Sequence, residues 1–126
     1  MVNHKFKYLY RDAGNYKEYG SVIFSNPDNM LPETAEKILR ECFLEGCLFI
    51  ADQLGIANHF LYIRGDASSD DHCFHEFEHV EATLEPPNDS MGRSITRFIR
   101  TVKRQSSRGW NVFDPHSIED FHPAGF

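Results

Sequence analysis

The chain has 126 residues, of which 40% are hydrophobic and 13% aromatic, and its formal net charge is -6. This length and composition predict one domain with a packed core, spanning residues 1–126. The acidic balance argues against binding to long nucleic acid, because such binding needs many cations to neutralise phosphates. No apolar run approaches the about 18 residues of a membrane span, and the N-terminus lacks the apolar core of a signal peptide. We therefore expect a cytoplasmic protein that does not enter the membrane.

The sequence lacks the common signatures of cofactor and metal binding. Three cysteines form an odd set without C-x-x-C spacing, which indicates neither a disulfide framework nor a cysteine zinc site. The phosphate-binding, dinucleotide-binding and serine-hydrolase motifs are also missing. We expect no cofactor.

The first forty-odd residues predict a strand pair followed by a helix. Residues 5–11 alternate in polarity, as strands do, and residues 21–25 form a second β-rich run after a turn at 12–15, so the two runs predict an antiparallel pair. Pro32 suits the first turn of a helix that we expect to span 32–45 and to end at Gly46. Its apolar residues recur at helical spacing: Ala35, Ile38, Leu39, Cys42 and Phe43.

The middle of the chain is harder to interpret. Residues 47–51 form a short apolar run that predicts a buried strand, and residues 60–63 suit either a strand or a short helical turn. Residues 65–71 form a polar loop.

The last third of the chain predicts a second helix, over 94–106. Ser94 is a good N-cap, and the apolar residues that follow it fall on one helical face: Ile95, Phe98, Ile99 and Val102. We expect a returning strand at 110–113, a capped turn at 117–120 and a tail at 122–126. The expected fold is α+β, with a mainly antiparallel sheet of four or five strands and two helices packed on one face.

Residues 75–79 read H-E-F-E-H, the H-E-x-x-H pattern of zinc hydrolases. That chemistry needs a helix, which places the two histidines one turn apart. A helix is allowed by the spacing of Cys73, Phe77, Val80 and Leu84. On a strand, His75 and His79 share a face but lie roughly 13 Å apart, too far for one metal ion. We predict no metal site and keep a small zinc hydrolase as an alternative.

Five arginines recur at spacings of 4, 3, 4 and 4 residues: Arg93, Arg97, Arg100, Arg104 and Arg108. On a helix they form one stripe, and each like-charged i,i+4 pair costs a few tenths of a kcal/mol. The acid-rich segment 70–85 or the acidic face of a second subunit is able to offset that repulsion. An anionic ligand is the other candidate, because arginine binds phosphate through two parallel hydrogen bonds.

Aromatic residues near the same region are able to stack a nucleobase, although each also suits a core. They are Phe74, Phe77 and Trp110. Asn88 is able to hydrogen-bond a base edge or a ribose, but in the string P-P-N-D it is equally a turn residue.

Three strings resemble one family: K-Y-L-Y-R-D-A-G-N-Y-K at 7–17, V-I-F-S-N-P at 22–27 and D-D-H-C-F-H-E-F at 70–77. They are similar to a group of small bacterial and phage proteins that includes the phage type 1 Thoeris anti-defence proteins, and the resemblance covers about the first ninety residues. It implies a homo-oligomer, a hexamer in the family, that captures cyclic nucleotide signals without cleaving them and so blocks an anti-phage immune response in the host cytoplasm. The ligands implied are cyclic ADP-ribose-type signals and cyclic oligonucleotides.

The resemblance further implies a site at a subunit interface, with arginines from the last helix. Residue chemistry and position together give these ligand-binding candidates: Phe74, Phe77, Asn88, Arg97, Arg100, Arg104 and Arg108. No catalytic residue is predicted. Besides the zinc hydrolase, a protein-interaction or inhibitor module remains an alternative.

Overall fold

A computed structural model describes residues 2–63 and 65–117. Its elements are β1 (Asn3–Arg11), β2 (Lys17–Phe24), α1 (Pro32–Cys42), β3 (Leu48–Phe49), the 3-10 helix η1 (Ala51–Leu54), β4 (His75–Thr83) and α2 (Ile95–Arg108). No helix in these ranges is long and apolar enough to cross a membrane.

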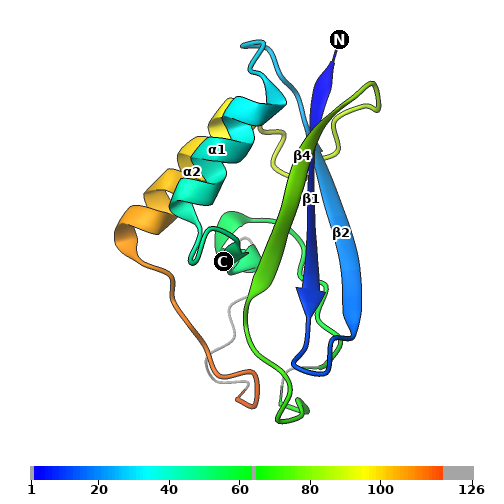
Figure 1. Cartoon of the computed structure of the whole chain (residues 1–126), viewed down its shortest axis with the longest axis vertical. Coiled ribbons are helices and arrows are strands. Elements are labelled where there is room, and N and C mark those ends of the chain that lie inside the picture. Colours follow the sequence, from blue (N-terminus) through cyan, green and yellow to red (C-terminus); the bar gives the residue numbers. More distant parts are fainter. Residues whose placement is uncertain (1, 64, 118–126) are drawn as a thin grey trace.

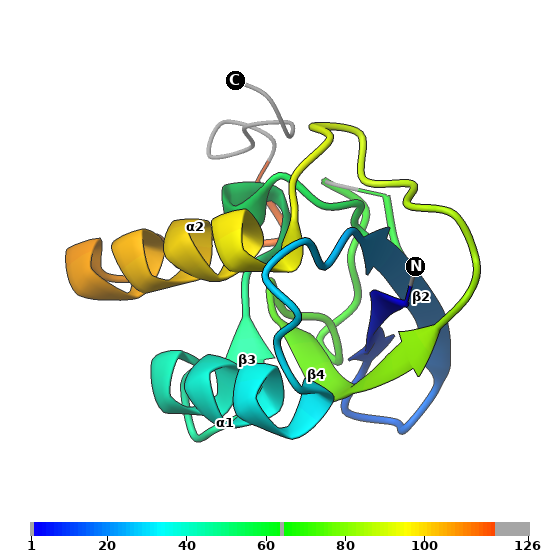
Figure 2. The same cartoon turned by 90° about the horizontal axis from the view of Figure 1, so that it is seen from above.

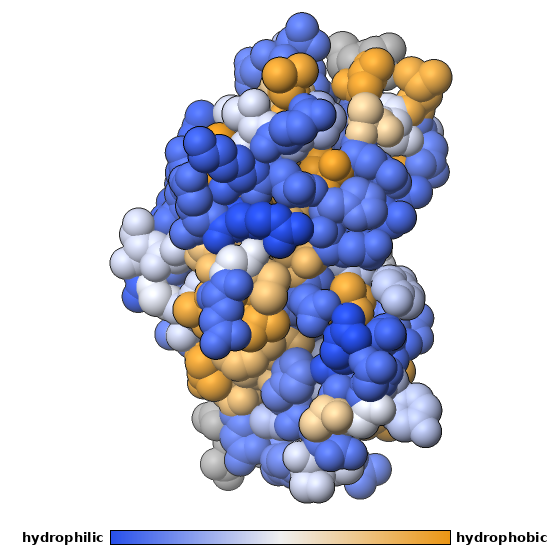
Figure 3. Space-filling view, viewed as in Figure 1, coloured by the Kyte–Doolittle hydropathy of each residue, from blue (hydrophilic) through white to orange (hydrophobic). Residues whose placement is uncertain are grey.

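The four strands form one antiparallel sheet in the order β2-β1-β4-β3, which confirms the predicted α+β fold. Both helices lie on one side of the sheet (Figure 1), and seen from above they run side by side in the same direction (Figure 2). The surface over α1 is mainly hydrophilic (Figure 3). The outward face of α1 is therefore solvated.

The core forms between the helices and one face of the sheet. Phe6, Tyr8 and Tyr10 are fully buried on β1, as their alternation predicts. Phe6 stacks on Phe77 of β4 with ring centroids 5.1 Å apart and meets Phe98 of α2 edge-on at 5.2 Å. Through Phe6, β1 therefore packs against both its neighbour β4 and the helix layer.

A β-bulge interrupts β4. Lys7 lies opposite His79 and Tyr8 lies opposite Phe77, so Glu78 is the extra residue on β4. Before the bulge Phe77 is buried, and after it the buried position moves to Val80. The bulge therefore reverses which residues of β4 face the core.

The two helices match their predicted positions with small shifts at the ends. α1 ends at Cys42 rather than near residue 45, because Phe43 is already extended while its N–H bonds to the carbonyl of Leu39. In α2 the Ser94 side chain accepts a hydrogen bond from the backbone N–H of Arg97, which confirms the predicted N-cap.

Several predictions for irregular segments are wrong. The strand expected at 47–51 is reduced to β3, because the chain turns into η1 at Ala51, and this short helix ends at Gly55 with a φ of 71°. Residues 60–63 form neither a strand nor a helical turn, and 110–113 do not form a strand. The tail at 122–126 and most of the predicted turn at 117–120 lie outside the described residues.

Candidate functional site

The candidate site is the outer side of α2. Its buried residues, Ile95, Phe98, Ile99 and Val102, mark the side that faces the core. Because successive helical residues are rotated by about 100°, the four arginines of the helix fall on the opposite side. All four are exposed: Arg97, Arg100, Arg104 and Arg108.

Three of these arginines border a groove of about 250 Å³. Its lining residues are Met91, Arg93, Arg97, Arg100, Thr101 and Arg104. The hydroxyl of Thr101 donates to the carbonyl of Arg97 at 3.2 Å, so it is held within the helix surface. Arg108 is not among the lining residues and lies in the last helical turn, where a cation is favourable to the helix dipole.

Arg93 differs from the other arginines of the predicted stripe because it is buried, with 4% of its surface exposed. It forms an ion pair with Asp89 at 2.8 Å and donates to the carbonyl of Leu54 at 2.7 Å. Burial opposes ionisation of Asp89, but the hydrogen bonds from Arg93 outweigh it and hold the pKa of that carboxyl below its ordinary value. The interpretation of Arg93 as one of five equivalent surface arginines is therefore wrong.

The acid-rich segment 70–85 does not neutralise the arginines of α2. Its glutamates pair instead across the sheet with cations of β1: Glu76 with Arg11, Glu81 with Lys7, and Glu85 with Lys5. Among residues 2–63 and 65–117, no acidic side chain forms an ion pair with Arg97, Arg100, Arg104 or Arg108. Two of the groups that the sequence analysis named as able to offset the repulsion between these arginines remain: a second subunit and an anionic ligand.

The other sequence candidates do not join this groove. Phe77 is 3% exposed and belongs to the core, with the Arg40 guanidinium 4.7 Å from its ring centroid. Asn88 binds the edge of β2: its N–H donates to the carbonyl of Ile23 and its Oδ1 accepts from the N–H of the same residue. Both residues therefore have clear structural roles within the chain.

Phe74 is half-buried and lines a different cavity, of about 210 Å³, at the end of the sheet. Leu48, His72 and the Arg11–Glu76 ion pair also border it. No described residue lines both this cavity and the arginine groove. Trp110, the other aromatic candidate, packs against the core.

The H-E-x-x-H segment lies on β4, so the helix that zinc chemistry needs is not formed. The bulge also places His75 and His79 on opposite faces of the sheet. The expectation that they share one face on a strand is therefore wrong. His75 is buried, and its Nε2 accepts from the backbone N–H of His59, whereas His79 is half-exposed between Glu78 and Glu81. The described ranges contain no group of three His, Cys, Asp or Glu residues that could hold a metal ion.

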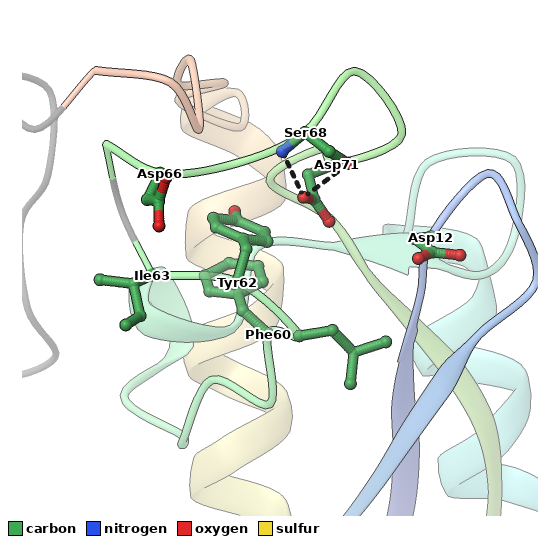
Figure 4. A pocket seen from close by; sticks show the side chains of 8 residues that line it. Asp12, Phe60, Tyr62, Ile63, Asp66, Ser68 and Asp71 are labelled. Atoms are coloured by element: carbon green, nitrogen blue, oxygen red, sulfur yellow. Dashed lines mark hydrogen bonds between the residues drawn. The ribbon is translucent and has the colours of Figure 1, made fainter.

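Sequence reasoning missed a larger hollow of about 570 Å³ at the 60–71 loop. Figure 4 shows Phe60 and Tyr62 within it, with Asp66 and Asp71 beside the rings, and the two rings stack at 4.6 Å. Asp71 accepts hydrogen bonds from the hydroxyl of Tyr10 and from Ser68, which fix its carboxylate. The signal in the sequence was the aromatic alternation at 60–62, but only the fold brings distant acids to it.

We compared the chain with protein-family models, curated proteins and solved structures, and found no match. The arginine groove and the three sequence strings are the features of this chain that indicate a function.

Proposed function

We propose that this protein binds a small anionic nucleotide signal and sequesters it without cleaving it. The ligand class is a cyclic ADP-ribose-type signal or a cyclic oligonucleotide, and the biological result is the block of an anti-phage immune response in the host cytoplasm. The protein acts as a member of the type 1 Thoeris anti-defence group that its strings resemble.

The observation that carries this proposal is the groove on α2. It gathers the exposed guanidiniums of Arg97, Arg100 and Arg104 without an acidic partner among the described residues. Guanidiniums bind phosphate oxygens through paired, charge-assisted hydrogen bonds, and such contacts relieve the repulsion between like charges. A phosphate or pyrophosphate group suits this surface better than a neutral ligand does.

The composition of the groove supports binding rather than catalysis. Its lining side chains are those of arginine, methionine and threonine, with no carboxylate or imidazole among the described ones. General acid–base cleavage of a phosphodiester most often uses such a group within hydrogen-bond reach of the reacting atoms. We therefore assign the groove no catalytic residue.

The size of the groove supports an oligomer. Its volume of about 250 Å³ lies below the roughly 300 to 1,000 Å³ typical of sites that enclose a small molecule. One chain then holds the phosphates, while bases and riboses contact a second subunit of a homo-oligomer. Phe74, whose cavity shares no described lining residue with the groove, is a candidate for such a contact from a neighbouring chain.

The test is a thermal-shift titration of the purified protein with cyclic ADP-ribose-type signals and cyclic dinucleotides. We expect at least one of them to raise the melting temperature, because a ligand that binds the folded state stabilises it. The bound compound is then released by heat and analysed by mass spectrometry. Recovery of intact nucleotide supports sequestration, a hydrolysed product contradicts it, and no shift with any compound rejects the proposed ligand class.

A further inference from the structure

The outer edge of β2 exposes backbone groups that have no hydrogen-bond partner among the described residues. β2 is an edge strand of the sheet, with β1 on one side and, within residues 2–63 and 65–117, no strand on the other. The opposite edge, β3, is two residues long, and only Ile50 separates it from η1. β2 is therefore the long open edge of this fold.

The contacts of Ile23 show which groups of β2 point outward. Its N–H and its carbonyl both bond to Asn88, on the side away from β1. Because backbone groups alternate along a strand, Ser21, Tyr19 and Lys17 point the same way. Among residues 2–63 and 65–117, no backbone hydrogen bond satisfies the outward groups of these three residues.

We propose that this edge pairs with the same edge of a second copy of the chain, antiparallel, about a two-fold axis at Tyr19. Tyr19 then faces its own counterpart, and Lys17 faces Ser21 of the other copy. Three outward residues on each chain supply about six hydrogen bonds in such a pair. The result is one continuous sheet across the dimer.

The alternatives to this register are worse. A two-fold axis at Ser21 brings Tyr19 against Ile23, whose outward groups already bond to Asn88. An axis at Lys17 sets two lysines directly opposite each other, which is destabilising. The axis at Tyr19 uses all three open residues and opposes no like charges, since Glu18 then faces Gly20.

The side chains at this edge also favour a partner. Tyr19 is 58% exposed, and in register with the buried Leu9 it lies on the sheet face opposite the helices. The two Tyr19 rings become cross-strand neighbours in the dimer, and aromatic pairs at such positions are stabilising. This contact supplies one surface for the oligomer of the proposed function, but it does not depend on any nucleotide.

The test measures the molar mass of the full chain in solution by sedimentation over a dilution series. We expect the wild-type chain to associate, and Tyr19→Asp or Tyr19→Lys alone to raise the dissociation constant by at least about tenfold, because like charges meet at the axis. Mixing the two variants restores association, because the charges are then opposite. Tyr16→Asp serves as the matched control and leaves association unchanged, because Tyr16 is also exposed, at 73%, but lies outside the strand.

A second pair of variants keeps Tyr19 intact. Ser21→Glu places a carboxylate opposite Lys17 and is expected to tighten association, whereas Ser21→Lys weakens it. A monomeric wild-type chain at every concentration overturns the inference, and so does an oligomer whose mass is indifferent to the charge at residues 19 and 21. An oligomer indifferent to these charges leaves the nucleotide proposal unchanged. A monomer contradicts its homo-oligomer part, whereas nucleotide binding itself is tested separately by thermal shift.

Discussion

Arg93 and Asp89 form a buried ion pair, with Arg93 Nε 2.8 Å from Asp89 Oδ2 and with 3% and 2% of the two side chains exposed. The same guanidinium donates to the carbonyls of Leu54 and Gly55, so it fastens the start of α2 to η1. Arg93 also lines the groove. The arginine surface of α2 is thus positioned by an arginine whose own charge is already satisfied.

Arg93→Met is expected to lower the free energy of unfolding by about 3 to 5 kcal/mol, because it leaves the buried carboxylate of Asp89 without its partner. Urea denaturation followed by circular dichroism measures the change. Lys7→Ala is the control, since it removes an exposed ion pair with Glu81 and is expected to have a much smaller effect. Equal losses in the two variants would contradict the structural role of Arg93.

Arg100→Ala and Arg104→Ala are expected to weaken nucleotide binding by roughly tenfold to a hundredfold each, since each removes a charge-assisted hydrogen bond worth about 1.5 to 3 kcal/mol. Calorimetric titration with whichever nucleotide gives the largest thermal shift measures the loss. Lys103→Ala is the matched control: it removes one exposed cation from the same helix, but at a position that does not line the groove. If all three variants bind alike, the groove is not the site.

Gly20→Ala is expected to destabilise the fold by about 1 to 3 kcal/mol through overpacking. A Cβ atom at residue 20 would overlap His59 Nε2, and this imidazole is also hydrogen-bonded to the hydroxyl of Tyr8 at 3.2 Å. Thermal unfolding of the single and double variants with His59→Ala tests the cause. The two changes are expected to be non-additive, with Gly20→Ala costing much less once the ring is gone.

The sequence predicted β1 well because its aromatic residues alternate regularly. For β4 the sequence allowed either a helix or a strand, and the reason is physical. The bulge at Glu78 inserts one residue, so the buried positions run Cys73, His75, Phe77 and Val80. These positions are two, two and three residues apart, so they depart from the two-residue period of a strand. Residues 73, 77 and 80 alone have the spacing of a helix. The pairing with β1 that creates the bulge is a long-range contact that local periodicity does not contain.

The candidate site was predictable in part. Helical spacing was enough to place Arg97, Arg100, Arg104 and Arg108 on the exposed side of α2, because the apolar residues fix the buried side. It could not separate Arg93, which has the same spacing but meets the carbonyls of Leu54 and Gly55 from a distant part of the chain. Likewise, Phe77 and Asn88 have their partners on β1 and β2, which only the folded sheet brings near.

Zinc is expected neither to bind stoichiometrically nor to raise the melting temperature, because His75 is buried on the core face of β4 while His79 faces the other way. Metal analysis of the purified protein, before and after incubation with zinc, measures this. One zinc per chain that disappears in His75→Ala would falsify the expectation and revive the hydrolase alternative.

Acidification from pH 6.5 to pH 5 is expected to reduce the stability of the fold through His75. Burial, helped by the nearby His59 and His72, lowers the pKa of this imidazole to about 3, whereas in the unfolded chain it is about 6.5. Between these two values the unfolded state binds a proton that the folded state does not. The stability contributed by the neutral ring is therefore complete above pH 6.5 and is lost as the pH falls towards 3.

The slope expected from this one group is up to about 1.4 kcal/mol per pH unit. Urea denaturation at several pH values between 6.5 and 5 measures this slope. The carboxylates of Asp71 and Asp89 stay ionised over this interval, because their pKa values are lowered. His4 and His59 also have lowered pKa values and add to the total slope. His75→Phe suits the surrounding aromatic rings and removes the proton that His75 takes up on unfolding. It is therefore expected to lower the slope of the free energy of unfolding against pH by up to about 1.4 kcal/mol per pH unit, whatever its effect on the stability at neutral pH. Identical slopes in the two proteins would show that His75 titrates normally in the fold.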